Sequence, residues 1–445
     1  MAKIKAFRGY RYNPEKIDNT NLGVVMAPPY DTVSSSEQNN YYSSDEHNII
    51  RISKGIKNDD DTEENNCYTR AADCLNKWTA EGVLKQEPES AIYLYEQRVK
   101  YNETTFVNHG IVALLELSEL SDSEVVTCEL PSISTTQDRY RLLSSIKANV
   151  DMINCMYIDP EKTLSSLILN LSATPPDVEF TTEEHVIESI GTHKLWVIKD
   201  EETINFVKSA LKNKTFFITD GHNRYITALE YKNQCIEHDP NYTENSDCNY
   251  IMALCTNAFG NRMLQLPVHR MISNNKKFNE DFFVACAQDH FKVEKIIVDT
   301  ANDNITETMK KQIATVRKET IFAVYCGGNY FYRLTLTDKD FIKTILPGKS
   351  SSYRSLDVVV LNKLIIEDIL NIPEDKYDDY ISYTKRTTKG VNAVKNKEVS
   401  CLFVLNPVKA EQIREVALSG DIMPDRAIYI FPKPATGVVV YKFDK

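Results

Sequence analysis

Five consecutive residues, Asp220-Gly221-His222-Asn223-Arg224, carry groups that could bind or transfer a phosphate. The apolar run before them, at 216–218, predicts a buried strand, and apolar residues at 225, 228 and 229 predict a helix after them. A glycine at such a turn lets the backbone approach an anion, and the first-turn N–H groups of the helix favour negative charge. Arg224 would add a bidentate fork, and His222 and Asn223 would add neutral donors.

Asp220 separates two interpretations of this junction. A carboxylate beside a phosphate is repelled unless a divalent cation or a transferable proton lies between them. Its presence therefore favours metal-assisted phosphoryl transfer over simple phosphate binding. The alternative is structural: Asp220 caps the helix, Gly221 makes the turn, and His222 and Arg224 are exposed side chains of the first turn. Spacing alone leaves both interpretations open.

Further charged residues could take part in the chemistry. Glu129 follows a predicted strand, where a carboxylate suits a general base that takes a proton from a hydroxyl nucleophile; a solvated loop glutamate is the alternative. Asp138-Arg139 lies near the start of a predicted helix and could be a first-turn acid beside a surface base. His269-Arg270 follows an apolar run and could equally be a surface pair.

Other catalytic motifs find no support. The run 347–350 (PGKS) resembles the end of a P-loop, but Lys343 stands where the earlier glycine is required and no apolar strand immediately precedes it. The sequence contains neither HExxH nor GxSxG, so zinc-peptidase and serine-hydrolase chemistry are not expected. Its ten cysteines include no CxxC pair, which excludes zinc-ribbon and thioredoxin-like spacing.

Composition predicts a folded protein and argues against nucleic acid as its main partner. A length of 445 residues suggests two or three domains, and 42% apolar with 26% charged residues is ordinary for globular chains. The net charge of -11 argues against nucleic acid as the main partner, because that affinity comes from Lys and Arg neutralising phosphates. Neither a membrane-length apolar run nor a secretion segment is visible, so we expect a cytoplasmic protein with no membrane partner.

Three regions position the candidate residues. Residues 1–90 are rich in turns and end in an acidic loop followed by an amphipathic helix. Residues 91–275 begin with a predicted hairpin, continue as alternating strands and helices, and form the expected chemical centre. Residues 276–445 include a predicted hairpin that turns at Gly327-Gly328.

Residues 218–229 resemble the signature of the ParB/sulfiredoxin-like superfamily, and specifically the Asp-Gly-His-His-Arg motif of free-serine kinases. Other segments occur in the order seen in a large bacterial family of this superfamily: APPYD (27–31), YLYEQ (93–97), the Glu129 loop, LPVHR (266–270) and MPDRAIYIFPKPATG (423–437). The resemblance covers nearly the whole chain. It implies a mixed α+β fold, with a ParB/sulfiredoxin-like catalytic core at 91–275 and additional α+β regions on either side.

The characterised activity that this resemblance implies is pyrophosphate-dependent phosphorylation of free L-serine to O-phosphoserine, which feeds serine and cysteine metabolism. Asp220, Gly221, His222 and Arg224 look like the phosphate-donor and Mg²⁺ site, with Asp220 as a catalytic residue and metal ligand. Glu129 is similar to the glutamate that deprotonates the serine hydroxyl. The resemblance also implies donor contacts from Asn223 and Arg139, and substrate contacts from Asp31, Arg270 and Arg426.

Two departures from the kinase pattern matter. Asn223 replaces the second histidine of the motif; it can still donate a hydrogen bond but cannot relay a proton near neutral pH. Ala427 follows Arg426 where relatives have Ser or Thr, so a hydroxyl contact is lost there.

Several alternatives stay open. The donor could be ADP or ATP, although no adenine-binding motif is visible. A non-enzymatic ParB-like nucleotide- or DNA-binding regulator is opposed by the acidic composition. A sulfiredoxin-like reductase would need a cysteine inside the motif, where this chain has His222 and Asn223. The sequence does not determine the oligomeric state.

Overall fold

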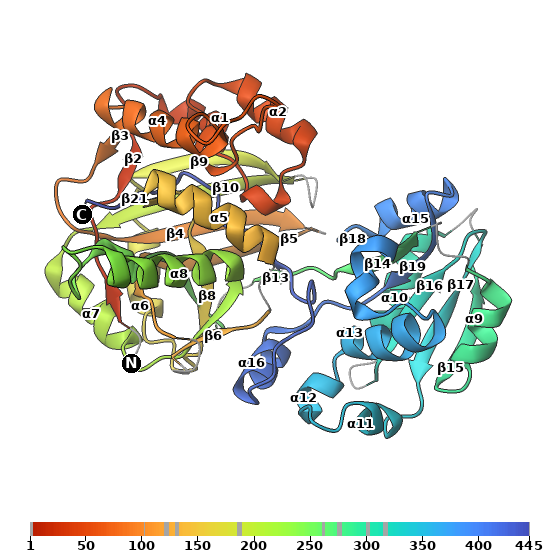
Figure 1. Cartoon of the computed structure of the whole chain (residues 1–445). Coiled ribbons are helices and arrows are strands. Elements are labelled where there is room, and N and C mark those ends of the chain that lie inside the picture. The colour runs from red at the N-terminus through yellow and green to blue at the C-terminus, as the bar shows by residue number, and fades with distance from the viewer. Residues whose placement is uncertain are drawn as a thin grey trace. The chain divides into compact units, whose positions relative to one another are not determined.

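The computed structural model describes residues 3–101, 103–119, 124–129, 133–184, 189–259, 263–273, 278–299, 303–314 and 319–444. They form two compact units (Figure 1). Unit 1 contains residues 1–264 and 430–445, and unit 2 contains residues 265–429. Residues 1–90 therefore pack within the same unit as the expected chemical centre, and the C-terminal segment returns to it. Both units mix helices with strands, which confirms the expected α+β fold class.

Unit 1 is built on a nine-stranded mixed sheet. Its spatial order is β6 (Val125–Thr127), β11 (Phe216–Asp220), β8 (Ile153–Tyr157), β12 (Tyr250–Asn257), β5 (Thr104–Glu116), β4 (Ile92–Tyr101), β10 (Ser189–Ile198) and β9 (Val178–Glu184), with β1 (Ile4–Lys5) also on β5. The β6–β11 and β8–β12 pairs are parallel, and the predicted hairpin is the antiparallel β4–β5 pair.

Helices cover both faces of this sheet because its strands are apolar on both sides. Tyr93 and Tyr95 of β4 belong to one buried cluster, together with residues of α4 (Cys67–Ala80). Ile92 and Leu94 belong to the opposite cluster, with residues of α7 (Glu201–Leu211) and α8 (His222–His238). Alternate side chains of a strand point to opposite faces, so unit 1 is a three-layer arrangement.

Unit 1 also contains shorter strands and further helices outside the main sheet. They are β2 (Tyr10–Tyr12), α1 (Leu22–Val25), α2 (Ser35–Ser44), α3 (Ile50–Ser53), β3 (Leu84–Gln86), α5 (Ile133–Ile146), β7 (Ala148–Asn149), α6 (Ser165–Ser172) and β21 (Tyr441–Lys442). The predicted helix after the acidic loop is α4: Asn66 caps its start, and it ends before Gly82, whose φ of 71° suits glycine.

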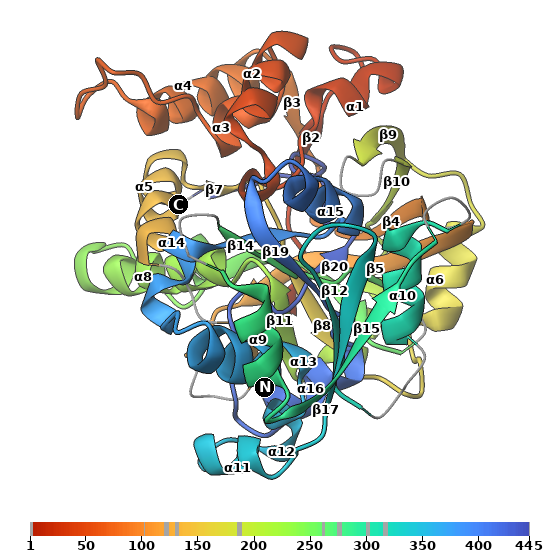
Figure 2. The ribbon, with the colours of Figure 1, turned by 90° about the vertical axis from the view of Figure 1, so that its right-hand side faces the viewer.

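Unit 2 holds a six-stranded antiparallel sheet (Figure 2). Its order is β15 (Phe291–Ile297), β17 (Tyr330–Leu336), β16 (Ile321–Tyr325), β19 (Val399–Val404), β14 (His269–Ser273) and β18 (Ile381–Thr384). The hairpin β16–β17 turns at Gly327 and Gly328, both with positive φ, as the sequence predicts.

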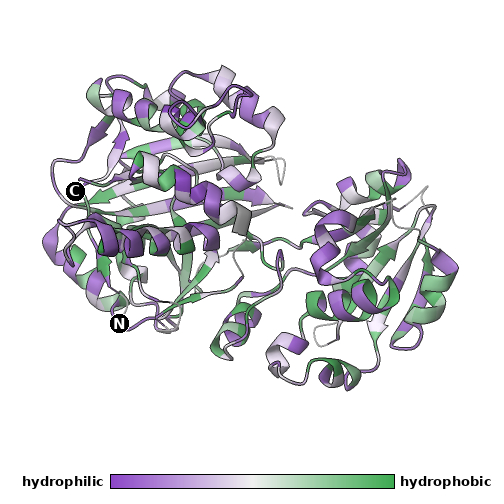
Figure 3. Ribbon diagram, viewed as in Figure 1, coloured by the Kyte–Doolittle hydropathy of each residue, from purple (hydrophilic) through white to green (hydrophobic). Residues whose placement is uncertain are grey.

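Two layers of helices enclose this second sheet. Residues of α9 (Glu280–Ala287) and the π-helical segment Leu361–Ile369 share a buried cluster with one strand face, and residues of α10 (Ile305–Ala314) and α15 (Thr387–Lys395) share a cluster with the other. Hydrophobic residues concentrate on the strands and on the helix sides that face them (Figure 3). Among the helices of the described residues, none is both long and apolar enough to cross a membrane.

Candidate functional site

The predicted strand-to-helix junction is present at the Asp-Gly-His-Asn-Arg sequence. β11 ends at Asp220, α8 begins at His222, and Gly221 between them has φ 93° and ψ 24°. This left-handed conformation is costly for residues with a Cβ. A Cβ on Gly221 would also lie 2.8 Å from Cγ2 of Ile153. Glycine therefore fixes the turn that presents the first N–H groups of α8.

The structural alternative for this junction is wrong in its details. Gly221, not Asp220, occupies the N-cap position. His222 is buried, and the Arg224 side chain keeps 11% of its surface exposed. Nε2 of His222 lies 2.8 Å from the Ile218 carbonyl oxygen, so the imidazole donates its N–H to the backbone. A phosphate could then accept a hydrogen bond from the backbone N–H of His222, while the neutral imidazole stabilises the turn through its bond to Ile218.

Asp220 and Arg224 belong to a chain of alternating charges. The Asp220 carboxylate lies 2.8 Å from Nη2 of Arg224 and 2.5 Å from Nζ of Lys433. Lys433 also donates to Asp31 at 2.7 Å. In the spatial order Asp31–Lys433–Asp220–Arg224, each carboxylate has a cation as neighbour. These cations reduce the repulsion expected between Asp220 and a phosphate.

Three distant segments meet to build this cluster. Thr436 donates its backbone N–H to the Ala27 carbonyl at 2.8 Å, which places the KPATG segment beside APPYD. Gly437 donates to the Val150 carbonyl at 3.1 Å, and the Thr436 hydroxyl donates to the Asp151 carboxylate. The C-terminal segment thereby fixes Lys433 in position.

The cluster perturbs the ionisation of its members. Burial raises the pKa of the Asp31 carboxyl, but Lys433 and Arg224 outweigh it and leave that pKa below its ordinary value. The Asp31 side chain keeps 43% of its surface exposed. Burial raises the pKa of Asp151 despite Arg224. Burial lowers the pKa of Arg224, but the neighbouring carboxylates raise it overall.

Glu129 lies at the same end of the sheet as Asp220. β6 runs parallel to β11, with Thr127 opposite Ile218. Glu129 and Asp220 are each two residues beyond that pair, so both lie at the carboxyl ends of neighbouring parallel strands. Proteins of the α/β class commonly bind ligands at such ends. Glu129 is half-buried, and its carbonyl accepts a hydrogen bond from the Thr127 hydroxyl at 2.6 Å.

Asn223 connects this edge to α5, the helix that carries Arg139. Oδ1 of Asn223 accepts a hydrogen bond from the Thr136 hydroxyl at 3.4 Å. Arg139 is buried, donates to the Ser53 carbonyl at 2.7 Å and stacks 3.9 Å from the centre of the Tyr30 ring. Arg139 also shares a small cavity with Asp151 and Arg224. The surface interpretation of Arg139 is therefore wrong, while its predicted donor contact remains a prediction.

Arg270 and Arg426 lie together in unit 2. Their guanidinium carbons lie 5.4 Å and 4.4 Å from the centre of the Tyr383 ring, and Arg270 donates to the Arg426 carbonyl at 3.2 Å. His269 and Arg270 are buried, so the surface interpretation of that pair is wrong. Nε2 of His269 lies 2.9 Å from the Thr387 hydroxyl, and Nδ1 accepts the Leu405 N–H at 3.2 Å. The substrate roles of Arg270 and Arg426 stay predictions.

Sequence reasoning missed Lys433 and Asp151 as members of the site. Lys433 lies 402 positions from Asp31 in sequence, and no local periodicity reports such a contact. The available signal was that FPKPATG places one cation between two prolines in a segment already singled out with APPYD.

The described residues contain no group of three or more His, Cys, Asp or Glu side chains arranged to hold a metal. Mg²⁺ is commonly held by one or two carboxylates together with substrate phosphates and water. Asp220 is the predicted metal ligand, and in the structure its carboxylate contacts Lys433 and Arg224. The predicted Mg²⁺ dependence remains a prediction.

Buried His222 predicts a loss of stability in acid. Burial lowers its pKa to about 4, below the ordinary 6.5. The unfolded chain therefore binds the proton first as pH falls, and the stability contributed by neutral His222 is fully present above pH 6.5 and lost progressively towards pH 4. Urea unfolding at pH 7 and pH 4.5 should give a loss of about 2 kcal/mol from this residue. In His222→Gln this part of the loss should disappear; an unchanged pH dependence would contradict the assignment.

Comparison with known proteins gives the family. A profile described as "Protein of unknown function (DUF1015)" matches residues 4–359. The chain belongs to this family. A search of curated proteins finds no match for this DUF1015 chain.

Solved structures similar to this DUF1015 protein have low identity. A conserved hypothetical protein from Pyrococcus furiosus has 8% identity and a TM-score of 0.32, covering 69% of this chain and 87% of that one. A mutant free serine kinase in complex with ADP has 8% identity and a TM-score of 0.34, covering 69% and 84%. SbnI with a C-terminal truncation, from Staphylococcus aureus, has 9% identity and a TM-score of 0.35, covering 73% and 85%. At these values the similarity assigns no activity.

Proposed function

We propose that this protein is a phosphotransferase that phosphorylates the hydroxyl of free L-serine, with pyrophosphate as donor. One observation carries the proposal: Asp220 forms ion pairs with Lys433 and Arg224 at the start of α8. Glu129 lies at the same end of the neighbouring strand β6. The proposed choice of serine as substrate rests on the resemblance to free-serine kinases. ADP or ATP is the alternative donor.

The donor site is proposed to bind phosphate through charge and backbone N–H groups. Pyrophosphate is a compact polyanion, and the ammonium of Lys433, the guanidinium of Arg224 and the first-turn N–H groups of α8 could neutralise it. Asp220 would hold these cations in place and bind Mg²⁺, which would neutralise charge on the phosphoryl oxygens. Asp31 is proposed to contact the substrate. Asn223 and Arg139 are the further proposed donor contacts.

In the proposed step, Glu129 takes the proton from the serine hydroxyl, whose oxygen forms a bond to one phosphorus of pyrophosphate. The bond from that phosphorus to the bridging oxygen breaks, and the second phosphate leaves with its electron pair. The products are O-phosphoserine and phosphate. Arg270 and Arg426, which belong to unit 2, keep as a proposal the substrate-binding role that the resemblance implies. Catalysis would rest mainly on positioning and charge stabilisation.

The direct test is to incubate the purified protein with L-serine and Mg²⁺ plus pyrophosphate, ADP or ATP, and to measure O-phosphoserine. Glu129→Gln should lower turnover by roughly 10²- to 10⁴-fold, because general-base catalysis contributes on that order, while donor affinity changes little. Glu116→Gln is a matched control, since Glu116 is a partly buried glutamate paired with Lys3 at 3.2 Å. Absence of O-phosphoserine with every donor would refute the kinase proposal, and undiminished turnover in Glu129→Gln would remove Glu129 from the base role.

A further inference from the structure

A second cavity lies in unit 1, beyond the Asp220 cluster. It has a volume of ≈ 500 Å³, within the range typical of small-molecule sites. Its walls come from α2, the segment after α3, and α5, and its lining includes Ser53, Lys54, Lys57, Tyr68, Asp138 and Arg139. Tyr30 also lines it, beneath the stacked Arg139 guanidinium. None of the roles proposed above uses this volume.

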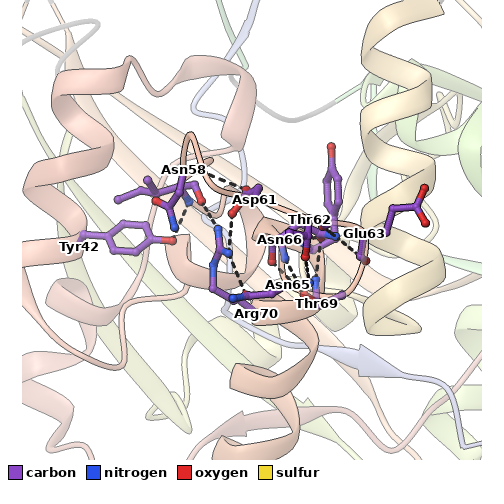
Figure 4. Close-up of polar contacts among 11 residues, drawn as sticks. Tyr42, Asn58, Asp61, Thr62, Glu63, Asn65, Asn66, Thr69 and Arg70 are labelled. Carbon is purple, nitrogen blue, oxygen red and sulfur yellow. Dashed lines mark hydrogen bonds and ion pairs between the residues drawn. The ribbon is translucent and has the colours of Figure 1, made fainter.

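The acidic loop 58–66, which joins the lining residues 55–57 to Cys67 and Tyr68, is held by polar contacts (Figure 4). Arg70 donates to the Asp61 carboxylate at 2.7 Å, to the Asn65 side chain at 3.1 Å and to the Ile56 carbonyl at 2.9 Å. The Ile56 N–H donates to the Tyr42 hydroxyl at 2.9 Å. The loop is thus pinned at both its start and its end, which fixes the adjoining wall residues 55–57.

The charge of the lining favours an anion. Three cations, Lys54, Lys57 and Arg139, line the cavity, and among the described lining residues Asp138 is the one carboxylate. Asp138 already accepts hydrogen bonds from Lys57 at 3.0 Å, Tyr68 at 2.7 Å and Nε of Arg139 at 3.0 Å. Burial raises its pKa, but Arg139, Tyr68 and Lys57 lower it overall to about 2, so it stays ionised and occupied. The lining therefore keeps two positive charges in excess, in a chain whose net charge is -11.

Two donors in the lining retain capacity for a ligand. Ser53 is fully buried, and its hydroxyl has no hydrogen-bond partner among the described residues. A buried polar group without a partner is costly, and such groups in native proteins often mark a missing ligand or water. The Lys54 ammonium donates to the carbonyls of Tyr30 and Val33, which leaves one of its three N–H groups. Burial lowers the pKa of Lys54, and the positive charge of Arg139 lowers it further.

We propose that this cavity binds a small, oxygen-rich organic anion, a phosphorylated or carboxylated metabolite, through Ser53, Lys54, Lys57 and Arg139. Two sources share that chemistry: the non-transferred part of a phosphoryl donor, or a separate metabolite. Arg139 lines this cavity and also the small cavity that contains Asp151 and Arg224, so an anion bound here would lie next to the Asp220 cluster.

Calorimetric titration of the full chain with AMP, O-phospho-L-serine and citrate tests the inference without measuring turnover. We expect at least one probe to bind, and Ser53→Ala to weaken that binding by about fivefold or more. Ser53→Ala removes a hydroxyl without a protein partner, so its Tm should equal or exceed that of the wild type. Lys57→Gln should weaken binding similarly, because Lys57 is a surface-accessible cation of the lining, and Lys100→Gln, another exposed lysine in an ion pair, should not.

The variants also separate the two sources of the ligand. A bound probe that supports phosphoryl transfer, or competes with the donor, identifies the cavity as part of the donor site; a probe that does neither identifies a separate metabolite site. Either result supports the inference. Failure of every probe to bind at millimolar concentration, or binding that Ser53→Ala and Lys57→Gln leave unchanged, would overturn it. Because binding is measured directly, this outcome is independent of whether the protein phosphorylates serine.

Discussion

Asp220→Asn should lower phosphoryl-transfer turnover by on the order of 10²- to 10³-fold, comparable to removing a group aimed at transition-state charge. The Asp220 carboxylate is the member of the cluster that both Lys433 and Arg224 contact, at 2.5 Å and 2.8 Å. An amide of the same shape could accept one of these hydrogen bonds but carries no charge. It would therefore neither hold both cations strongly nor bind Mg²⁺ beside a phosphate.

Steady-state measurement of O-phosphoserine formation, with the donor that the wild type uses, checks this expectation. Asp340→Asn provides a matched control: Asp340 also pairs with a lysine, Lys343, but its side chain is 87% exposed and lies in unit 2. Exposed ion pairs contribute little, so this control should keep wild-type turnover and Tm. Turnover within twofold of the wild type in Asp220→Asn would remove Asp220 from the catalytic role.

The strand-to-helix junction could be predicted because its determinants are local. Phe216, Phe217 and Ile218 are fully buried as their apolar run indicates, and glycine at 221 signals the left-handed turn before α8. The hairpins β4–β5 and β16–β17 were predictable for the same reason, since strand alternation and turn residues lie within a few positions of each other.

The environment of the junction could not be predicted, because it depends on segments far away in sequence. His222 and Arg224 occupy first-turn positions that a solitary helix would expose. Here APPYD and KPATG lie side by side, and their residues Asp31 and Lys433 continue the charge chain from Asp220. The lysine between two prolines at position 433 is a weak sign of this contact, since the same pattern is equally suited to an exposed turn.

The cluster also explains how a chain with a net charge of -11 could bind a polyanion. Total charge governs long-range attraction, whereas affinity within a site depends on the few groups that the ligand contacts. The carboxylates of this cluster are each paired with a cation, and the helix N-terminus adds N–H groups without a counter-charge. The acidic composition therefore disfavours nucleic acid as a partner without disfavouring a small phosphate.

Gly221→Ala should destabilise the protein by about 2–4 kcal/mol, which combines the cost of a left-handed non-glycine residue with overpacking. A Cβ at this position would lie 2.8 Å from Cγ2 and 3.1 Å from Cβ of Ile153, and 3.0 Å from Nη2 of Arg224. Ile153 is fully buried and β-branched, so its side chain has little freedom to move. Arg224 is held by Asp220 and by the Met152 carbonyl at 2.9 Å.

Gly82→Ala separates the two contributions. Gly82 has a similar positive φ, 71°, but a Cβ there would meet nothing within 4 Å. The control should therefore lose only about 1–2 kcal/mol, the cost of the backbone conformation. Urea unfolding of both variants measures the difference, which we assign to the close approach of Gly221 to Ile153 and Arg224. Equal losses of unfolding free energy in the two variants would show that the junction can relax around a methyl group. Gly221 would then be required for its backbone angle and not for close packing at the start of α8.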